Sequence, residues 1–389
     1  MDIGNVSADE SVRLCAGLSA RLRSARESRG LTRRALAAQA DLAPGTVNSL
    51  EAADRNVGVA TVERLATVMG VSPAWLAYGA QPVRRVFNYH VAPGFDPLGY
   101  LRHVDAVVRG VGGKLDPSML YIDPFSAVQY AALTEGAKQL PLEAASRFIS
   151  GIEPWSVIAM GSGMARHETR LVELISRQTR RYEDDFSIYL FLIEISHTLL
   201  VGGYTHAMER LQGNVPVTAI EGDFEGLPSF MHYFAPQGPR RKLVTMLGFT
   251  IGNLPNEIDF LRESLVGCTS GDLLLVDFGL RQGSIKEEAA ASLARAKPHL
   301  SFLTKPLSRV YGEDNIAIDS KIANRCPIPN SYALEIYATV KDRRFMVASW
   351  RRYDAKSLFD AFGSIGWHHV GSWTFDDEKP NCLALFKRN

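Results

Sequence analysis

Two short stretches of the chain place glycine and acidic residues directly after apolar, β-rich segments. The segment 157–160 runs into the turn Gly161-Ser-Gly163, and the segment 188–193 ends at Glu194. Glycines allow backbone N–H groups to approach a ligand, and an acidic residue at the end of the next strand can accept hydrogen bonds from two ribose hydroxyls. Together these stretches predict a nucleotide-binding site on an α/β sheet.

Later segments carry further groups that could bind a nucleoside. Asp223 follows the next β-rich segment and could accept a hydrogen bond from an adenine amino group, while Phe224 could pack beside the ring. The segment 242–249 continues into Thr250-Ile-Gly-Asn253. Ligands on open α/β sheets bind at the carboxyl ends of the strands, where all of these signals fall. We therefore expect these residues to share one site.

The glycine turn distinguishes between nucleotide cofactors. Gly161-Ser-Gly-Met-Ala-Arg166 lacks the third glycine of a dinucleotide-binding fingerprint, and no P-loop lysine follows it. A single nucleoside without a pyrophosphate fits this pattern better, which predicts S-adenosylmethionine (SAM) as the cofactor. Taken alone, the turn could also be a plain connection between a strand and a helix.

The elements that must position these residues are strands that alternate with helices. Such alternation predicts a mostly parallel sheet covered on both faces. Later β-rich runs with short connections predict an antiparallel edge. The predicted parallel strands are residues 157–160, 188–193, 217–221, 242–249 and 272–278, the later runs are 332–340, 344–350 and 382–386, and helices are expected at 97–109 and 124–140.

Composition along the chain predicts several regions. A length of 389 residues exceeds one ordinary hydrophobic core. Arginine is frequent near the N-terminus, whereas the first lysine is Lys114, and turn signals lie between residues 80 and 95. We predict an all-α helix-turn-helix domain at residues 1–80, a helical linker or substrate lid at 81–150, and an α/β domain at 151–389.

Residues 18–79 have the pattern of five short helices. They resemble the lambda-repressor and Cro-like (XRE-type) helix-turn-helix family, and Val71-Ser-Pro-Ala-Trp-Leu76 is typical of its last helix. The recognition helix expected at 44–51 could touch bases through Thr46 or Asn48, but it carries no Arg or Lys.

Near that helix, arginine residues favour DNA binding and acidic residues oppose it. Phosphate contacts could come from Arg33, Arg34 and Arg55. The acidic residues that offset part of this charge are Asp41, Glu51 and Asp54. DNA binding stays open, but a role in packing or in forming a homodimer is the favoured alternative.

Bulk composition argues against several classes of protein. A formal net charge of +1 gives no reason to expect a polyanionic partner. The four cysteines are scattered, so neither a disulfide framework nor a zinc site is indicated. The start of the chain lacks the pattern of a signal peptide, and no apolar run reaches the roughly 18 residues that a membrane span requires. We expect a cytoplasmic protein that binds neither a metal nor a membrane.

Six segments in order resemble the histidine-specific Nα-methyltransferase family of the ergothioneine pathway. The resemblance covers roughly residues 110–389 and implies the class I SAM-dependent methyltransferase fold, Rossmann-like with a mostly parallel sheet. The segments are Gly161-Ser-Gly with Thr169-Arg170, Glu194-Ile-Ser196, Gly222-Asp-Phe224, Leu247-Gly-Phe-Thr-Ile-Gly-Asn-Leu254, Phe260-Leu-Arg262 and Gly271-Asp-Leu-Leu-Leu-Val276.

The resemblance also implies roles for individual residues. Glu194 stands where the family has an aspartate for the ribose, and Asn253 matches the residue that holds the substrate's amino group. The cofactor-binding residues that it implies are Gly161, Ser162, Gly163, Arg170, Glu194, Ile195, Asp223, Phe224 and Gly248. The expected substrate-binding residues are Tyr121, Thr250, Asn253 and Trp350.

Departures from the family predict a different substrate. His167-Glu168 replaces the usual lysine before Thr-Arg, and Ala348 and Trp350 replace a Glu-x-Ser pair that hydrogen-bonds imidazole. Each lost bond to a buried polar group costs about 1–3 kcal/mol, so histidine is not expected to be the substrate. A small alanine beside a flat tryptophan suits a larger aromatic side chain, such as that of tyrosine. Core packing is the alternative role for Trp350.

Methyl transfer to a phenol ring carbon or oxygen requires a base, whereas a neutral amine does not. His232 and Tyr233 are the candidate catalytic residues, His167 is a weaker one, and Asp277 is interpreted as a turn cap. The predicted function is SAM-dependent methylation of a small amino-acid-like molecule on carbon, oxygen or nitrogen, in specialised metabolism such as antibiotic biosynthesis. The alternative is a DNA-binding regulator whose C-terminal domain senses SAM or an amino acid.

Overall fold

The computed structural model describes residues 17–53, 57–69, 71, 73–78, 88–111, 115, 117–133, 139–149, 154–178, 188–212, 214–234, 240–296, 301–323, 326–376 and 380–389. Contacts divide the chain into two compact units, Met1–Val86 and Phe87–Asn389. The helices between residues 97 and 149 therefore belong to the same unit as the sheet. Each unit has its own hydrophobic core.

The first unit is all-helical, as the sequence predicts. Its helices are α2 (Leu18–Ser28), α3 (Arg33–Gln39), α4 (Pro44–Ala52), α5 (Val59–Met69) and α6 (Pro73–Tyr78). Thr32 caps α3, because its hydroxyl oxygen accepts a hydrogen bond from the backbone N–H of Ala35 at 3.1 Å. Apolar side chains from successive helices, among them Leu22, Leu36 and Leu65, are fully buried at its centre.

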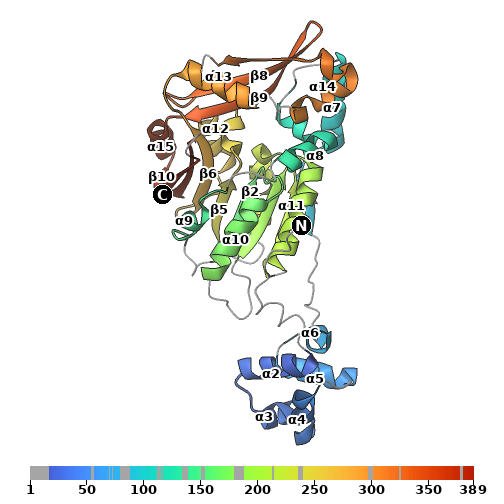
Figure 1. Cartoon of the computed structure of the whole chain (residues 1–389). Helices are drawn as coiled ribbons and strands as arrows, with labels where there is room; N and C mark the ends of the chain where they lie inside the picture. Colours follow the sequence, from blue (N-terminus) through green and yellow to red (C-terminus); the bar gives the residue numbers. More distant parts are fainter. Residues whose placement is uncertain are drawn as a thin grey trace. The chain divides into compact units, whose positions relative to one another are not determined.

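The second unit is built on a large mixed sheet (Figure 1). The described strands are β1 (Asn88–Val91), β2 (Trp155–Met160), β3 (Ile188–Glu194), β4 (Val217–Glu221), β5 (Arg241–Met246), β6 (Leu273–Leu280), β7 (Ala317–Ile322), β8 (Tyr332–Val340), β9 (Arg343–Tyr353), β10 (Trp367–Phe375) and β11 (Asn381–Arg388). Strands β2 to β6 pair in parallel in the order β4-β3-β2-β5-β6, and β11 pairs antiparallel with both β6 and β10. A parallel sheet closed by this antiparallel hairpin is the class I methyltransferase fold.

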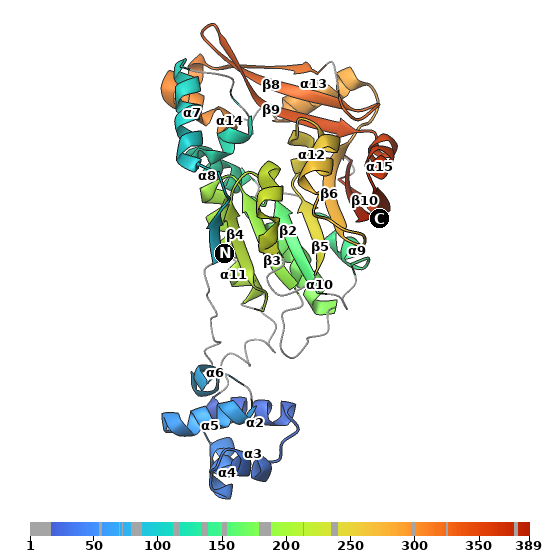
Figure 2. The same cartoon turned by 180° about the vertical axis from the view of Figure 1, so that it is seen from behind.

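Strands outside this arrangement extend the sheet in two directions. β1 adds a parallel strand to β4. β9 pairs with β6 only at its end, through Gly279 with Arg352 and Leu280 with Tyr353. Along the rest of its length β9 pairs antiparallel with β8, which pairs in turn with β7. Figures 1 and 2 show β8 and β9 crossing above the rest of the sheet, with α7 and α14 beside them.

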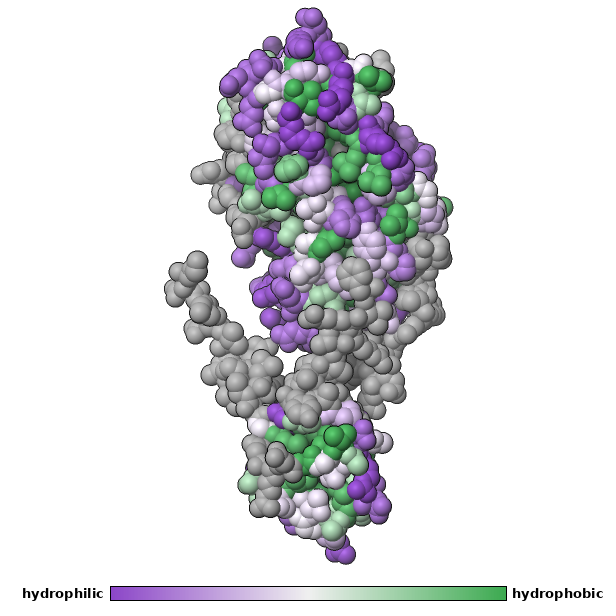
Figure 3. Space-filling view, turned by 90° about the vertical axis from the view of Figure 1, so that its right-hand side faces the viewer, coloured by the Kyte–Doolittle hydropathy of each residue, from purple (hydrophilic) through white to green (hydrophobic). Residues whose placement is uncertain are grey.

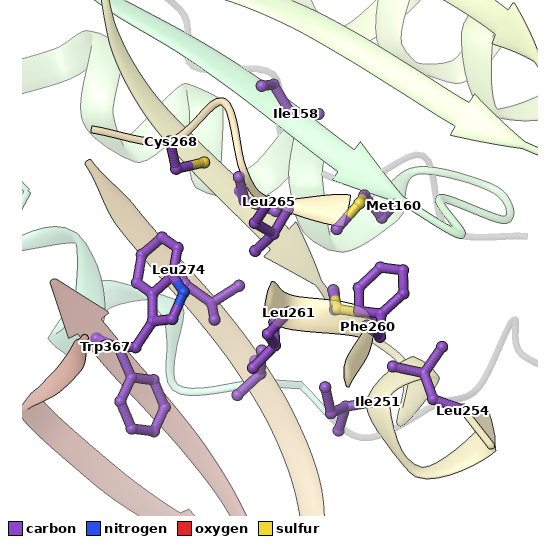
Figure 4. Close-up of a cluster of buried hydrophobic side chains, with 14 of the residues drawn as sticks. Ile158, Met160, Ile251, Leu254, Phe260, Leu261, Leu265, Cys268, Leu274 and Trp367 are labelled. Carbon is purple, nitrogen blue, oxygen red and sulfur yellow. The ribbon is translucent and has the colours of Figure 1, made fainter. Parts of the chain in front are cut away.

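Helices cover both faces of the parallel strands. α10 (Arg166–Gln178) and α11 (His197–Leu211) pack on one face, whereas α12 (Glu257–Ser264) and α15 (Ala355–Ser364) pack on the other. In the core on the second face, Ile158 and Met160 of β2 lie near Leu261 and Leu265 (Figure 4). Central parallel strands are buried on both sides, which explains their continuous apolar sequences.

A third layer packs against β8 and β9. Val107, Leu120, Leu303 and Leu307 belong to this cluster. Its elements are α7 (Pro97–Arg109), η1 (Pro117–Ile122), α8 (Pro124–Leu133) and α14 (Ser301–Tyr311). The remaining described helices are α9 (Leu142–Ser146), η3 (Phe224–Phe234), η4 (Thr250–Asn253), α13 (Ile285–Ala296) and η6 (Glu313–Asn315).

Hydrophobic and hydrophilic residues are interspersed on the face shown in Figure 3. Leu98, Phe125 and Val128 are exposed apolar side chains on α7 and α8. Across the described ranges, every helix is too short or too polar to cross a lipid bilayer.

Candidate active site

The glycine turn follows β2 and adopts a conformation that favours glycine. Gly161 and Gly163 have φ angles of +64° and +50°. The N–H groups of Gly161 and Ser162 donate to the carbonyl of Ile193 at 3.0 and 3.1 Å. These bonds fold the turn back over the end of β3.

Gly161 is also a point of close approach. A Cβ atom placed there would lie 3.1 Å from the Thr250 methyl carbon and 3.4 Å from a ring carbon of Phe224. Three predicted site residues from separate segments therefore meet at one place. On the other side of the turn, a Cβ on Gly163 would lie 3.8 Å from the ring of Tyr130.

Glu194 ends β3 and is 5% exposed. Its carboxylate accepts hydrogen bonds from the backbone N–H of Gly163 at 2.8 Å and of Ser196 at 3.1 Å. Burial raises the pKa of Glu194, while hydrogen bonds from backbone N–H groups, including that of Ile195, act in the opposite direction. The acidic group is thus fixed beside the glycine turn.

The segment after β4 holds the predicted adenine-binding residues. The carboxylate of Asp223 accepts a hydrogen bond from the backbone N–H of Glu225 at 2.9 Å. Phe224 packs edge-to-face on Phe260 of α12, with ring centroids 5.6 Å apart. This contact orients the Phe224 ring next to Gly161.

The segment after β5 forms η4. Gly248 and Phe249 have φ angles of +83° and +64°, and Phe249 N–H donates to the Asp277 carboxylate at 3.0 Å. The Thr250 hydroxyl donates to the carbonyl of Leu247 at 3.0 Å. Asn253 is exposed at the end of η4. Asp277 therefore caps the turn after β5, whereas its sequence position suggested that it caps the turn after its own strand.

Strand β9 anchors η4 from the other side. The Arg351 guanidinium donates to the carbonyls of Leu254 and Pro255 and pairs with the fully buried carboxylate of Glu257. The Tyr353 hydroxyl donates to Glu257 and to the carbonyl of Ile251 at 3.3 Å. These contacts hold the backbone that carries Thr250 and Asn253.

Aromatic side chains gather beside the glycine turn. The rings of Tyr121, Tyr130 and Phe302, which we call the aromatic group, have centroids 5.4 to 5.9 Å apart. Trp350 is half-buried and packs against the same hydrophobic cluster. Ala348, 5% exposed, lies two residues before it and is paired with Ile336 of β8. Because Tyr130 approaches Gly163, this apolar region is continuous with the turn.

Three buried acids, Glu168, Glu194 and Asp277, which we call the acidic trio, each have a raised pKa. Burial, with a smaller contribution from Asp277 and Glu194, raises the pKa of Glu168 to about 8. Burial raises the pKa of Asp277 to about 7, although backbone N–H groups oppose this. Burial, together with the charges of all three acids, raises the pKa of Tyr130 to about 12. The site thus combines an aromatic wall with buried acids.

Some predicted residues are placed away from this cluster or cannot be placed. Arg170 donates to Glu143 at 3.0 Å and contacts Glu173 at 3.5 Å, so its guanidinium is paired outside the acidic trio. The backbone of His232 and Tyr233 forms part of η3, but their side chains lie outside the described residues. His167 is half-buried, and burial lowers its pKa.

Tyr130, Glu168 and Phe302 lie beside the predicted site residues but were not themselves predicted from the sequence. Glu168 lies among the apolar positions of α10, where a charged residue on the buried face is unusual. That mismatch is a signal available from the sequence. Tyr130 and Phe302 have no such signal, because aromatic residues on helices are ordinary core residues.

The expected DNA-contacting surface of the first unit is largely uncharged in its centre. Asn48 is exposed and Thr46 is half-buried. Arg33 pairs with buried Glu51 at 2.8 Å, and Arg26 pairs with the same carboxylate. Glu51 is therefore an internal ion-pair partner. Asp54 and Arg55 lie outside the described residues.

Comparisons with known proteins give partial matches. Residues 22–76 match the family model described as helix-turn-helix. No curated protein matches the chain. The structure of the restriction-modification controller protein C.AhdI from Aeromonas hydrophila is 29% identical and covers 18% of this chain and 97% of its own, with a TM-score of 0.15.

Similar solved structures for the larger unit are methyltransferases. The CcbJ methyltransferase from Streptomyces caelestis is 13% identical and covers 76% of this chain and 99% of its own, with a TM-score of 0.35. The 1,6-didemethyltoxoflavin-N1-methyltransferase from Burkholderia thailandensis, solved with S-adenosylhomocysteine (SAH), is 10% identical and covers 77% and 92%, with a TM-score of 0.41. The strand order gives the larger unit the class I methyltransferase fold, and residues 22–76 match the helix-turn-helix family.

Proposed function

We propose that this protein is a SAM-dependent methyltransferase that acts on a small, aromatic, amino-acid-like substrate. One observation carries the proposal: Phe224 and Thr250, from two other strand ends, approach Gly161, while Glu194 is hydrogen-bonded to Gly163. When bound, SAM supplies an electrophilic methyl group on a sulfonium sulfur. The chain then has to orient an acceptor in line with that methyl group.

Buried polar atoms near the turn fit a polar cofactor. The Ser162 hydroxyl has no partner among the described residues, although Ser162 is 6% exposed. Such groups are normally satisfied, so a ligand is a reasonable source of the missing hydrogen bond. Glu194 would hold the ribose hydroxyls, and Asp223 and Phe224 would hold the adenine. Arg170 was predicted to contact the cofactor, but its ion pairs with Glu143 and Glu173 do not favour this role.

The aromatic group supports an aromatic acceptor. Tyr121, Tyr130 and Phe302 offer flat apolar surface next to Gly163, and ring pairs of this kind prefer edge-to-face or offset contacts. Ala348 and Trp350 replace the polar pair that binds imidazole in the resembled histidine-specific family. We propose that Trp350 contacts the acceptor ring and that Asn253, exposed at the end of η4, holds its amino group.

The acceptor atom decides whether a base is needed. A phenol carbon or oxygen must lose the O–H proton, whereas a neutral amine needs no base. His232 and Tyr233, on η3 after β4, remain the proposed proton acceptors. Asp277 has a pKa raised to about 7, close to the range of a general base, but its turn contacts favour a binding role.

Transfer of a labelled methyl group tests the activity. The protein is incubated with methyl-labelled SAM and single aromatic amino acids, and mass spectrometry detects product. We expect label on tyrosine or a close analogue, and none on histidine. Absence of product for every aromatic and imidazole substrate, together with retention of specific DNA, would contradict the enzyme proposal.

Glu194→Ala tests the cofactor site. Loss of the carboxylate removes the group that bonds Gly163 and the proposed ribose hydroxyls, so SAM binding should fall below detection in isothermal titration calorimetry. Glu209→Ala, on the exposed face of α11, is the control and should bind SAM normally. Intact SAM binding by Glu194→Ala would show that the site lies elsewhere.

A second function is favoured by one observation, the match of residues 22–76 to the helix-turn-helix family. In this alternative the protein regulates transcription, and the larger unit senses SAM or an amino acid without turnover. Selection of bound fragments from random DNA, with and without SAM, tests it. Enrichment of one sequence in a SAM-dependent manner would support regulation, whereas salt-sensitive binding to any DNA would not.

A further inference from the structure

The acidic trio comes from three different elements. Glu168 lies in the first turn of α10, Glu194 ends β3, and Asp277 lies in β6. All three are at most 5% exposed. The charges of Asp277 and Glu194 act on Glu168, and those of all three acids act on Tyr130 of α8. Glu194 also acts on Tyr121, and Asp277 on Cys382 of β11.

Within the described ranges, no ion pair balances this charge. Among the described residues, no Lys, Arg or His forms an ion pair with Glu168, Glu194 or Asp277. Arg166 and His167 are chain neighbours of Glu168. Burial and the charge of Arg166 lower the pKa of His167 and of His206 on α11, whereas the charges that act on Glu168 are those of Asp277 and Glu194. Buried acids without a cation are costly, so this arrangement requires an explanation.

Unsatisfied buried atoms on Asp277 and on the glycine turn that bonds Glu194 point to a ligand. The Oδ1 atom of Asp277 accepts the Phe249 N–H, but its Oδ2 atom is buried without a partner in the described structure, and Asp277 is 1% exposed. The buried Ser162 hydroxyl of the glycine turn is in the same condition. A metal ion is not the occupant that this geometry suits, since no group of three His, Cys, Asp or Glu side chains in the described ranges could hold one.

We propose that Glu168, Glu194 and Asp277 form a charge-selective subsite that binds the cationic cofactor SAM in preference to its product SAH. This inference rests on the proposed function. SAM carries a sulfonium and an ammonium against one carboxylate, a net charge of +1, whereas SAH has lost the sulfonium charge. A cation placed among uncompensated buried carboxylates gains an electrostatic interaction that the neutral thioether does not.

The same arrangement couples binding to protons. Near pH 7 the raised pKa values of Glu168 and Asp277 leave part of the trio protonated in the free protein. A bound cation lowers these pKa values, so protons leave when SAM binds. SAM affinity should therefore rise as pH increases towards about 8 and then level off, while SAH affinity changes less.

Calorimetry with three ligands tests the proposal on the full chain. SAM, SAH and sinefungin, which has a charged amine in place of the methylsulfonium, are titrated at pH 7 in phosphate and in Tris. The two buffers differ in ionisation enthalpy, so the difference in heat gives the protons released. We expect SAM and sinefungin to release about one proton more than SAH.

Variants identify the groups that release the proton. Glu168→Gln and Asp277→Asn should each reduce the SAM-over-SAH preference, by roughly tenfold for a pKa change of one unit, and flatten its pH dependence. Asp272→Asn is the matched control, because Asp272 is 1% exposed and precedes β6 at its opposite end, where it pairs with Lys242. This control should leave the proton count unchanged.

The outcomes separate this inference from the proposed function. Equal proton release and equal affinity for all three ligands, with normal binding, would overturn the charge-selective subsite alone. Failure of the folded protein to bind any of the three would overturn the proposed function and the subsite with it. The comparison of ligands on the unchanged protein does not depend on how well a variant folds.

Discussion

Two separate features of the structure require a glycine at position 161: its backbone conformation and the close approach of neighbouring side chains. The φ angle of +64° is one that residues with a Cβ rarely adopt, and that Cβ would press on Thr250 and Phe224. The sequence could predict the glycine's importance from its position after an apolar strand. The sequence also predicted that Phe224 and Thr250 share its site, because both follow later strands. It could not predict their direct contact with Gly161, because they lie about 60 and 90 residues further along the chain.

Gly161→Ala should lower stability and weaken SAM binding together. The left-handed conformation costs about 1–2 kcal/mol, and displacement of Thr250 and Phe224 should reduce SAM affinity at least about tenfold. Gly283→Ala is a matched control, since Gly283 has a φ of +62° with no atom near its Cβ position. Urea unfolding and calorimetry would measure both effects. Equal SAM affinity in the two variants would argue against the placement of the cofactor.

Among the secondary-structure elements, strand β9 contacts two parts of the candidate site. Its residues 348 and 350 lie in the layer that contains the aromatic group, whereas Arg351 and Tyr353 hold η4. The parallel strands were predictable from continuous apolar segments, and β1, β7 and β10 were not, because they are short or partly exposed. Contacts such as that between Arg351 and Pro255 link segments 96 residues apart, and a local pattern contains no information about them.

Tyr353→Phe tests the anchoring of η4. The substitution leaves the buried Glu257 without one donor, so the free energy of unfolding should fall by about 1–3 kcal/mol. Tyr337→Phe on β8 is the comparison, because its partner Glu335 is partly exposed and the expected loss is below about 1 kcal/mol. If η4 positions substrate groups, Tyr353→Phe should also raise KM more than the control. Similar unfolding free energies for both variants would contradict this role.

At the scale of the whole molecule, the chain contains two units with separate cores. The core of the helical unit contains Leu22, Leu36 and Leu65, and the larger unit has hydrophobic clusters on its own sheet. The general fold of each unit was predictable from its sequence pattern. In the first unit the apolar residues recur with the 3.6-residue period of a helix, and in the larger unit β-rich segments alternate with helical ones. The inclusion of the helices before residue 150 in the larger unit depends on long-range packing that periodicity does not reveal.

Residues 87–389 should therefore fold without the first unit. We expect the shortened chain to unfold cooperatively and to bind SAM within about twofold of the full chain, because every proposed cofactor contact lies within it. Differential scanning calorimetry and titration with SAM would measure this. Aggregation of the shortened chain, or loss of SAM binding by a folded one, would show that the units depend on each other.

The antiparallel pairing of β11 with β6 has a consequence for synthesis on the ribosome. Gly279 at one end of β6 is paired with Asn381 of β11. The central strand β6 therefore cannot form this pairing until about 100 further residues have been synthesised. Until then, the nascent chain presents β6 as an open apolar edge of the kind that promotes aggregation. Chaperone demand should therefore be highest while the segment between these two strands is being translated.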